Sequence, residues 1–439
     1  MSLKIKTLKL KGIRQFHDVT FDFTDPKTKK PLDRICLIGG NGTGKSTILK
    51  FLASNHGLGI PFSTPAWIVL NAPYANFAME FTDGIETATK TNAGNWHSTF
   101  DVALSADSLN NPRKTPEEVK HWNQQLTDSV AVFCPPDSEL APNSGSISTV
   151  PNSNLDTALR LLREHKSKFK VGQDSVADFW NLLIALVKDR ESRLLEYHRL
   201  TDNRDRTVRE LEEEFLKKNP DILKELAEFW EPILAKAGLK FDYEEASIPV
   251  QLTDNLKAYI KLAADNAVIP YADLSTGIRS FLFRLGHLFT IFRFHPNKGG
   301  IVLIDEPENS LYPDFLFDLV SYYEQAAPGA QMFFATHSPI VAAQFKPEER
   351  FILEFDPDLG IKVRRGVTPE GDDPNDVLLK DFAVRTLYGA KGVESWKRFR
   401  ELDLSIQTET DPQKRKAMLK EYLELGRTYN FDPQDEVSA

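Results

Sequence analysis

Polar and apolar residues alternate through residues 3–23, which is the pattern of strands that have one buried face. We predict two antiparallel strands here, with a bend near Gly12. A short apolar run, Ile35–Ile38, then stops at a glycine-rich loop, and Ser46–Ala53 has the composition of a helix. The chain is therefore expected to open with a strand pair, followed by a strand, a loop and a helix.

Residues 175–218 contain few Pro or Gly and many charges, and their apolar residues often recur at spacings close to three and four. This spacing predicts a long amphipathic helix that stops at Pro220. Asp221–Ala237 continues as a second helix, kinked at Pro232 and ended by Gly238. We interpret the pair as a helical hairpin, a short coiled coil that protrudes from the fold; an ordinary core helix is the alternative. The apolar positions of the first helix are Phe179, Leu183, Leu186, Leu194, Tyr197, Val208, Leu211 and Phe215.

Fully apolar segments replace this pattern in the last third of the chain. Gly300–Ile304 is a continuous aliphatic run, as expected of a parallel strand buried on both faces. Helical and strand-like segments alternate around it, which is the rhythm of βαβ units, and a charged helical tail begins near residue 370. Residues 56–155 are rich in Pro, Asn, Ser and Thr and indicate an elaborated sheet with long loops. The other predicted elements are strands at Trp67–Leu70, Phe77–Phe81, Val130–Phe133 and Gln331–Ala335, and helices at Leu274–Phe294, at Phe315–Ala326 and from Pro339.

The predicted fold is of the α/β class, with a mixed sheet in a head, a helical hairpin inserted into that head and a helical carboxyl-terminal tail. A length of 439 residues favours more than one structural unit. We expect the amino-terminal part of the head at residues 1–174, the hairpin at 175–240, the carboxyl-terminal part of the head at 241–369 and the tail at 370–439.

Composition and charge limit the cellular compartment and the kinds of partner that we expect for this protein. No long apolar run and no charged-then-apolar amino terminus occur, so we expect a soluble, cytoplasmic protein without a membrane partner. The two cysteines are Cys36 and Cys134, and the apolar run around Cys36 indicates a buried thiol rather than a disulfide. A formal net charge of -9 argues against a chain that coats nucleic acid over its whole surface. Local clusters such as Lys362 with Arg364 and Arg365 are expected to be solvated faces.

The glycine-rich loop fits the pattern G-x-x-x-x-G-K-[ST] between a predicted strand and a predicted helix, the context that a phosphate-binding P-loop requires. Glycines let backbone N–H groups surround phosphates, and the amino terminus of the helix adds its positive dipole end. We expect Lys45 to reach the β and γ phosphates of ATP, and the Ser46 hydroxyl to bind Mg²⁺. The predicted ATP-binding residues are Gly39, Asn41, Gly42, Thr43, Gly44, Lys45, Ser46 and Thr47.

The aliphatic strand before residue 305 ends in a pair of carboxylates. Four aliphatic residues deliver Asp305 to the strand end beside the nucleotide, where it should hold the metal together with Ser46. Glu306 is then the candidate general base, since a carboxylate next to a metal ligand can orient and deprotonate the attacking water. Glu308 is the rival for that role.

Two further segments resemble those of ABC-type ATPases. Leu274-Ser275-Thr276-Gly277 resembles the ABC signature, and Thr336-His337-Ser338 resembles the switch histidine of that family. The resemblance implies that Ser275, Thr276 and Gly277 of one subunit close over the γ-phosphate held by the P-loop of another, so that ATP joins the two. It also implies that His337 contacts the γ-phosphate or positions the attacking water.

The run from Asp305 to Pro313, D-E-P-E-N-S-L-Y-P, resembles the OLD-like and SMC-like branch of ABC ATPases, as does the amino-terminal Gly12–Phe16. The resemblance covers residues 1 to about 345. Within that branch, the short helical insertion and the small helical tail are most similar to the ATPase subunits of bacterial anti-phage modules such as Septu, the retron-associated ATPases and PARIS.

Three departures from the family pattern affect what the resemblance implies. Ile278 and Arg279 follow the signature glycine where transporters usually have Gln or Glu, which leaves the details of the contact between subunits open. Gln124 and Gln125 lie in the wrong context for the metal-binding glutamine of the family. About 100 residues follow His337, too few for the toprim nuclease of OLD proteins, so any nuclease is expected to be a separate polypeptide.

These features together predict a magnesium-dependent ATPase that forms a homodimer, or a higher even oligomer, around ATP. The resemblance implies a regulatory role in which the ATP-bound oligomer controls a separate nuclease or other effector in anti-phage defence. The alternative is a DNA-repair or chromosome-associated SMC-like ATPase that acts directly on DNA. A transporter subunit is disfavoured by the long helical insertion and by the D-E-P-E run.

Overall fold

The computed structural model describes most of the head and the tail. The sequence predictions at Trp67–Leu70, Pro220, Gln124 and Gln125 lie outside the described residues, as does much of 175–189. The described residues are 4–13, 15–55, 74–81, 86–92, 130–136, 168–171, 179, 190, 192–199, 207–219, 221–241, 260–269, 273–295, 299–358 and 360–431.

One mixed sheet runs through the head, in the strand order β5-β4-β1-β2-β14-β13-β3-β12-β11-β6-β7. Strands from β13 to β7 are parallel, and those from β5 to β13 are antiparallel. The predicted α/β class and the opening antiparallel pair are therefore confirmed. The strands are β1 (Ile5–Ile13), β2 (Phe16–Asp22), β3 (Arg34–Gly39), β4 (Tyr74–Phe81), β5 (Glu86–Asn92), β6 (Val130–Cys134), β7 (Lys168–Lys170), β11 (Gly300–Asp305), β12 (Ala330–Thr336), β13 (Arg350–Asp356) and β14 (Gly360–Arg365). A small second sheet has the order β10-β9-β8, with β8 at Leu239–Phe241, β9 at Ile260–Leu262 and β10 at Val268–Ile269.

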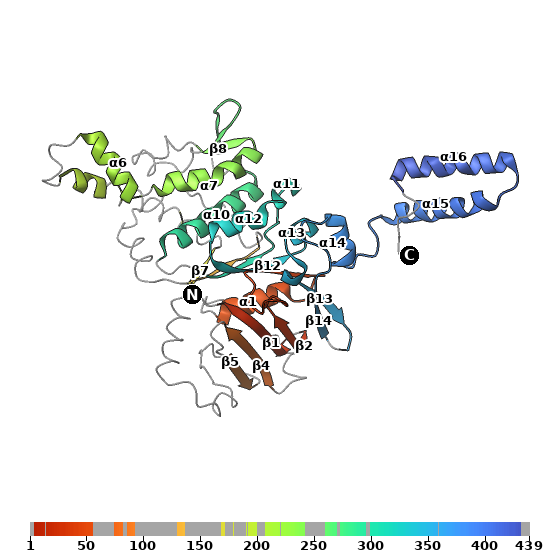
Figure 1. Ribbon diagram of the computed structural model, residues 1–439, viewed down its shortest axis with the longest axis horizontal. Coiled ribbons are helices and arrows are strands. Elements are labelled where there is room, and N and C mark those ends of the chain that lie inside the picture. Colours follow the sequence, from red (N-terminus) through yellow and green to blue (C-terminus); the bar gives the residue numbers. More distant parts are fainter. Residues whose placement is uncertain are drawn as a thin grey trace.

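Helices cover both faces of the parallel half of the sheet (Figure 1). In β3, Ile35 and Leu37 join the core under α1, whereas Cys36 and Ile38 join the core under α7, α10 and α12. This alternation explains the continuous apolar runs of the parallel strands, because both of their faces are buried. The helices are α1 (Lys45–Asn55), α6 (Val208–Lys218), α7 (Ile222–Lys236), α10 (Thr276–Phe294), α11 (Pro313–Leu316), α12 (Leu319–Ala326), α13 (Pro339–Ala343), the 3-10 turn η6 (Pro347–Glu349), α14 (Pro374–Lys380), α15 (Ala390–Thr408) and α16 (Pro412–Tyr429).

The single helix predicted over residues 175–218 is wrong. Thr207 has an extended backbone (φ -70°, ψ 148°) and forms a capping box with Glu210, so a new helix, α6, begins there. The rings of Tyr197 and Phe215 lie 5.8 Å apart between centroids, so the helical residues 192–199 fold back beside α6. Two described helical pieces therefore lie side by side within the segment that the sequence periodicity suggested to be one helix.

The second predicted helix, α7, belongs to the core of the head. It starts at the N-cap Asp221 and runs through Pro232 to Lys236. Leu226, Trp230 and Ile233 are buried in the cluster that also contains the apolar face of α10. For α7 the alternative interpretation, an ordinary core helix, is the one that the structure supports.

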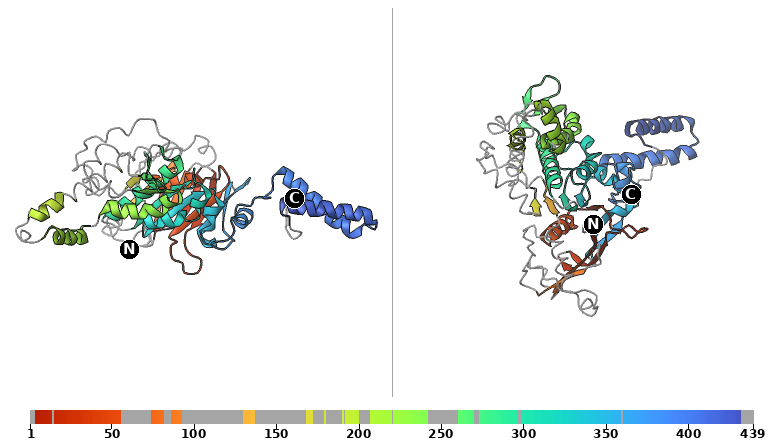
Figure 2. Two further views of the ribbon diagram at one scale, coloured as in Figure 1. Left: turned by 90° about the horizontal axis from the view of Figure 1, so that it is seen from above. Right: turned by 60° about the vertical axis from the view of Figure 1, so that its left-hand side comes forward.

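The carboxyl-terminal tail is helical, as predicted, and its last two helices project away from the head (Figure 2). The helices α15 and α16 pack against each other through stacked rings of Phe399 and Tyr422, whose centroids are 4.3 Å apart. Arg398 also pairs with Glu421 at 2.8 Å across this pair. No helix in the described part of the chain is both long enough and apolar enough to span a membrane.

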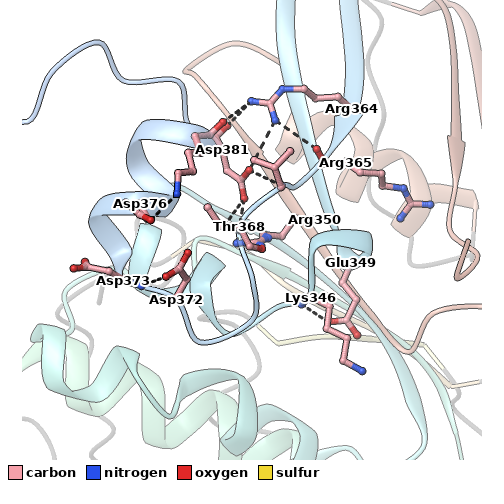
Figure 3. Close-up of polar contacts among 12 residues, drawn as sticks. Lys346, Glu349, Arg350, Arg364, Arg365, Thr368, Asp372, Asp373, Asp376 and Asp381 are labelled. Carbon is pink, nitrogen blue, oxygen red and sulfur yellow. Dashed lines mark hydrogen bonds and ion pairs between the residues drawn. The ribbon is translucent and has the colours of Figure 1, made fainter. Parts of the chain in front are cut away.

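A buried ion pair fixes the start of the tail to the head. The Arg350 guanidinium on β13 lies 3.1 Å from the Asp381 carboxylate at the end of α14, and neither side chain is exposed (Figure 3). Asp381 also accepts hydrogen bonds from the Val367 N–H and the Thr368 hydroxyl, each at 2.9 Å. The carboxylate therefore ties together three segments that are separate in the sequence.

The basic cluster at residues 362–365 is not a simple solvated face. Arg364 donates to Glu354 at 2.6 Å. It also donates to the carbonyl of Asp381 at 3.1 Å (Figure 3). Arg365 lies over the ring of Phe351, at 3.9 Å from its centroid. The expectation is thus wrong for these two arginines, because neighbouring strands and the end of α14 supply partners that the sequence pattern does not reveal.

We predict that Asp381→Ala lowers the free energy of unfolding by about 3–5 kcal/mol, because it leaves the Arg350 charge buried and unpaired. Urea denaturation at constant m-value measures the change. Glu421→Ala is the matched control, since its ion pair with Arg398 is exposed and its loss should cost less than about 1 kcal/mol. Equal losses for the two variants would contradict the structural role of the buried pair.

Candidate functional site

The P-loop joins the end of β3 to the start of α1, as predicted. Gly42 and Gly44 have positive φ angles of 81° and 101°, which favour glycine. A side chain at Gly44 would also collide with Gln15 and Phe16 in the β1–β2 turn. Gln15 donates a hydrogen bond to the carbonyl of Gly42 at 3.0 Å. The opening hairpin therefore packs directly against the loop and restricts its shape.

Lys45 is folded over this loop. Its ammonium group donates to the carbonyls of Gly39 at 2.8 Å and Gly40 at 3.1 Å, and the side chain is almost fully buried. Burial lowers the pKa of Lys45 to about 8, and the nearby carboxylates of Asp305, Glu306 and Glu308 oppose that shift. A cation held in this way is suited to an anionic ligand.

Ser46 and Asp305 meet across the ends of β3 and β11. The Ser46 hydroxyl donates to Asp305 Oδ1 at 3.0 Å, and Asp305 Oδ2 is buried without a hydrogen-bond partner. Burial raises the pKa of Asp305 to about 6, and the Ser46 hydrogen bond acts in the opposite direction. A hydroxyl and a carboxylate in contact are an oxygen donor set of the kind that Mg²⁺ takes, so these two residues fit the predicted metal site.

The two glutamates of the D-E-P-E run have different surroundings. Glu306 has a positive φ of 47°, is half-buried, and its carboxylate accepts a hydrogen bond from the Asn309 amide at 2.7 Å. Glu308 Oε1 accepts the backbone N–H of His337 at 2.7 Å, while its other oxygen is buried without a hydrogen-bond partner. The burial of Glu308 raises the pKa of its carboxyl group. The structure thus gives different surroundings to Glu306, the predicted base, and to Glu308, its rival for that role.

His337 directly follows β12, at the edge of the sheet where β11 ends in Asp305, and the residue is exposed. Partial desolvation and the positive charge of Lys45 lower the pKa of its ring, whereas Glu306 opposes this shift. The structure thus brings together the P-loop, Asp305, Glu306 and His337, all predicted from separate motifs.

The signature-like segment forms the start of α10. The Ser275 side chain is the N-cap and accepts from the Ile278 N–H at 3.4 Å. Thr276 is exposed in the first turn, whereas a side chain at Gly277 would collide with the carbonyl of Ser310. In this chain the segment therefore packs against the loop that follows Glu306 and Glu308.

Sequence reasoning assigned no role to Gln15 or Asn309. Gln15 supports the P-loop from the β1–β2 turn, and Asn309 holds the carboxylate of Glu306. Both lie in segments that resemble motifs of a known family, but the sequence of such a segment does not show which group a polar side chain contacts. The predicted loop residues Thr43 and Thr47 are buried, and the Thr43 hydroxyl donates to the carbonyl of Gly40 at 2.9 Å.

Two family models match parts of the chain. Residues 143–342 match a family model described as "AAA ATPase domain", and residues 7–54 match one described as "AAA domain". These matches identify an ATPase domain in the chain.

A comparison with solved structures finds Smc heads among its matches. The Smc head domain with an extended coiled coil, bound to the C-terminal domain of ScpA and derived from Pyrococcus furiosus, is 17% identical, with 83% of this chain and 96% of that chain covered and a TM-score of 0.37. The SMC head domain from Thermotoga maritima is 12% identical, with 83% and 100% covered and a TM-score of 0.33. The SmcHead bound to the C-winged helix domain of ScpA is 15% identical, with 82% and 98% covered and a TM-score of 0.40.

We predict that Gly277→Ala lowers the rate of ATP turnover by about tenfold or more, because its methyl group displaces Ser310 and with it the Asn309 contact to Glu306. Steady-state phosphate release measures the effect. Gly389→Ala is the control, since a methyl group there meets no atom within 4 Å. Full turnover in Gly277→Ala would show that the close contact with Ser310 does not shape the site.

Proposed function

We propose that this chain hydrolyses ATP with Mg²⁺ at the P-loop site. The observation that carries the proposal is the hydrogen bond between Ser46 and Asp305, with Lys45 beside it. This contact brings together a hydroxyl, a carboxylate and an ammonium group from two distant parts of the chain, and these are the groups that P-loop ATPases use to bind a metal-bound triphosphate. The ATPase family matches over residues 7–54 and 143–342 support the same chemistry.

Each residue of the site has a role in this proposal. The backbone N–H groups of the loop and Lys45 bind the phosphates, and Ser46 and Asp305 hold the metal ion, which neutralises charge on the phosphates when bound. Glu306 accepts a proton from the attacking water, and Asn309 orients its carboxylate. His337 faces the γ-phosphate from the end of β12.

We infer that a second copy of the chain completes the ATP-binding site. Ser275 and Thr276 are exposed at the amino terminus of α10, a helix of 19 residues, where free N–H groups and the helix dipole favour an anion. In a homodimer or higher even oligomer these residues would close over the γ-phosphate held by the partner's P-loop. ADP lacks that phosphate, so the assembly would depend on the state of the nucleotide.

We propose further that the ATPase cycle regulates a separate nuclease or other effector, in the manner of anti-phage ATPase subunits. The sequence contains no H-N-H pattern and no zinc-ligand spacing that would place such an activity in this chain. Direct action on DNA is the less favoured alternative, because Arg364 and Arg365 are engaged in contacts within the chain.

We predict that Glu306→Gln slows hydrolysis by about 10² or more while ATP stays bound, because the site loses its base but keeps its shape. Lys45→Ala should instead weaken ATP binding itself. Single-turnover hydrolysis and equilibrium binding of labelled ATP separate the two effects. Full turnover in Glu306→Gln would exclude Glu306 as the base.

We predict that Glu306→Gln protein purified from its native host with ATP contains an even oligomer and a stoichiometric nuclease or other effector. Mass photometry and mass spectrometry identify both, and Lys45→Ala is the matched control that should lose the ATP-dependent assembly. The regulatory role requires that the activity of the co-purified effector changes when ATP is removed. Chromosomal DNA without a protein partner would favour the alternative, and a membrane protein would contradict both.

A further inference from the structure

The backbone N–H of His337 lies just beyond the end of β12, and the Glu308 side chain provides its hydrogen-bond acceptor. In the ladder between β11 and β12, Asp305 lies opposite Ala335, and the N–H of Glu306 donates to the Ala335 carbonyl at 2.9 Å. The strand β12 ends at Thr336, one residue later. The next N–H, that of His337, donates to Glu308 Oε1 at 2.7 Å. The carboxylate thus extends the ladder by one hydrogen bond beyond the last strand residue.

The turn around His337 is held from both sides. The N–H of Ser338 donates to the Thr336 hydroxyl at 2.9 Å, and Ser338 caps α13 through the Val341 N–H at 3.3 Å. Glu308 holds the residue between these two contacts. The backbone of His337 is therefore fixed, while its exposed side chain stays available to a ligand.

The position of Glu308 does not suit a general base. One carboxylate oxygen binds the backbone of His337, and the other is buried and has no hydrogen-bond partner. A base must reach the proton of the attacking water within hydrogen-bond distance. Glu306 is half-buried, and one of its oxygens is held by Asn309 at the strand end. The two glutamates are therefore arranged for different tasks.

We propose that Glu308 is a positioning residue, which binds the main chain of His337 and so sets the imidazole relative to Lys45 and the carboxylates. This inference rests on the proposed ATP hydrolysis and assigns one further residue to it. The Glu308 carboxylate also ties the loop after β11 to the turn after β12, so that Glu306 and His337 keep a constant relation. Such positioning matters because a displacement of about 1 Å in an active site can cost about 10² in rate.

The Gln variant separates positioning from base catalysis. Glu308→Gln keeps a side-chain oxygen that accepts the His337 N–H, but it can no longer act as a base. We expect kcat within about threefold of the unaltered protein for Glu308→Gln, and a fall of about tenfold or more for Glu308→Ala, with the Kd for ATP nearly unchanged in both. Glu306→Gln is the matched control, in which kcat falls by about 10² or more.

Hydrogen exchange tests the same contact without relying on turnover. The His337 amide should exchange at least about tenfold faster in Glu308→Ala than in Glu308→Gln or Glu306→Gln, because only the Ala variant lacks the acceptor. Thermal denaturation of each variant confirms that it is folded. If the amide behaves as expected but no form hydrolyses ATP, the proposed function fails while the contact stands. Positioning is overturned if Glu308→Gln loses as much activity as Glu306→Gln, or if Glu308→Ala keeps full turnover or an unchanged amide.

Discussion

The candidate site depends on the parallel register of β3, β12 and β11, which sets the ends of three distant strands beside one another. Ile38 lies opposite Thr336, and Ala335 lies opposite Asp305. The residues that follow these positions form the P-loop, the His337 turn and the acidic loop. Closing such long segments costs chain entropy, which the burial of both faces of the strands offsets. The chemistry of the site therefore rests on the packing of the central strands.

This arrangement also explains why the site contains poorly solvated charges. Burial lowers the pKa of Lys45 to about 8 and raises that of Asp305 to about 6, so both shifts disfavour the charged form. A triphosphate would supply the anion that Lys45 needs, and a divalent cation would supply the charge that Asp305 needs. Binding of such a ligand would therefore compensate Lys45 and Asp305 for the solvation that they lose on folding.

Away from the site, one group of charged residues stabilises the fold. Arg350 and Asp381 are buried together, and Arg364 links β14 to β13 and to the end of α14.

The two helices of the predicted hairpin have different surroundings: α7 packs in the core, whereas α6 pairs with residues 192–199. The projecting parts are therefore smaller than the sequence periodicity indicated, because hydrophobic spacing alone does not distinguish a core helix from an exposed one.

The P-loop, the acidic strand, the start of α10 and the α/β class could all be predicted from the sequence, since each depends on contiguous residues or on local periodicity. Ser275 could be identified as a helix cap because its partner is three residues away. The tertiary structure was needed to distinguish the surroundings of Glu308 from those of Glu306, because the Glu308 carboxylate accepts the N–H of the distant His337. The tertiary structure also decided that residues 192–199 lie against α6 and that Arg350 is buried. Both outcomes depend on contacts between residues far apart in the chain, whereas the start of α6 carries a local signature, the Thr207–Glu210 capping box.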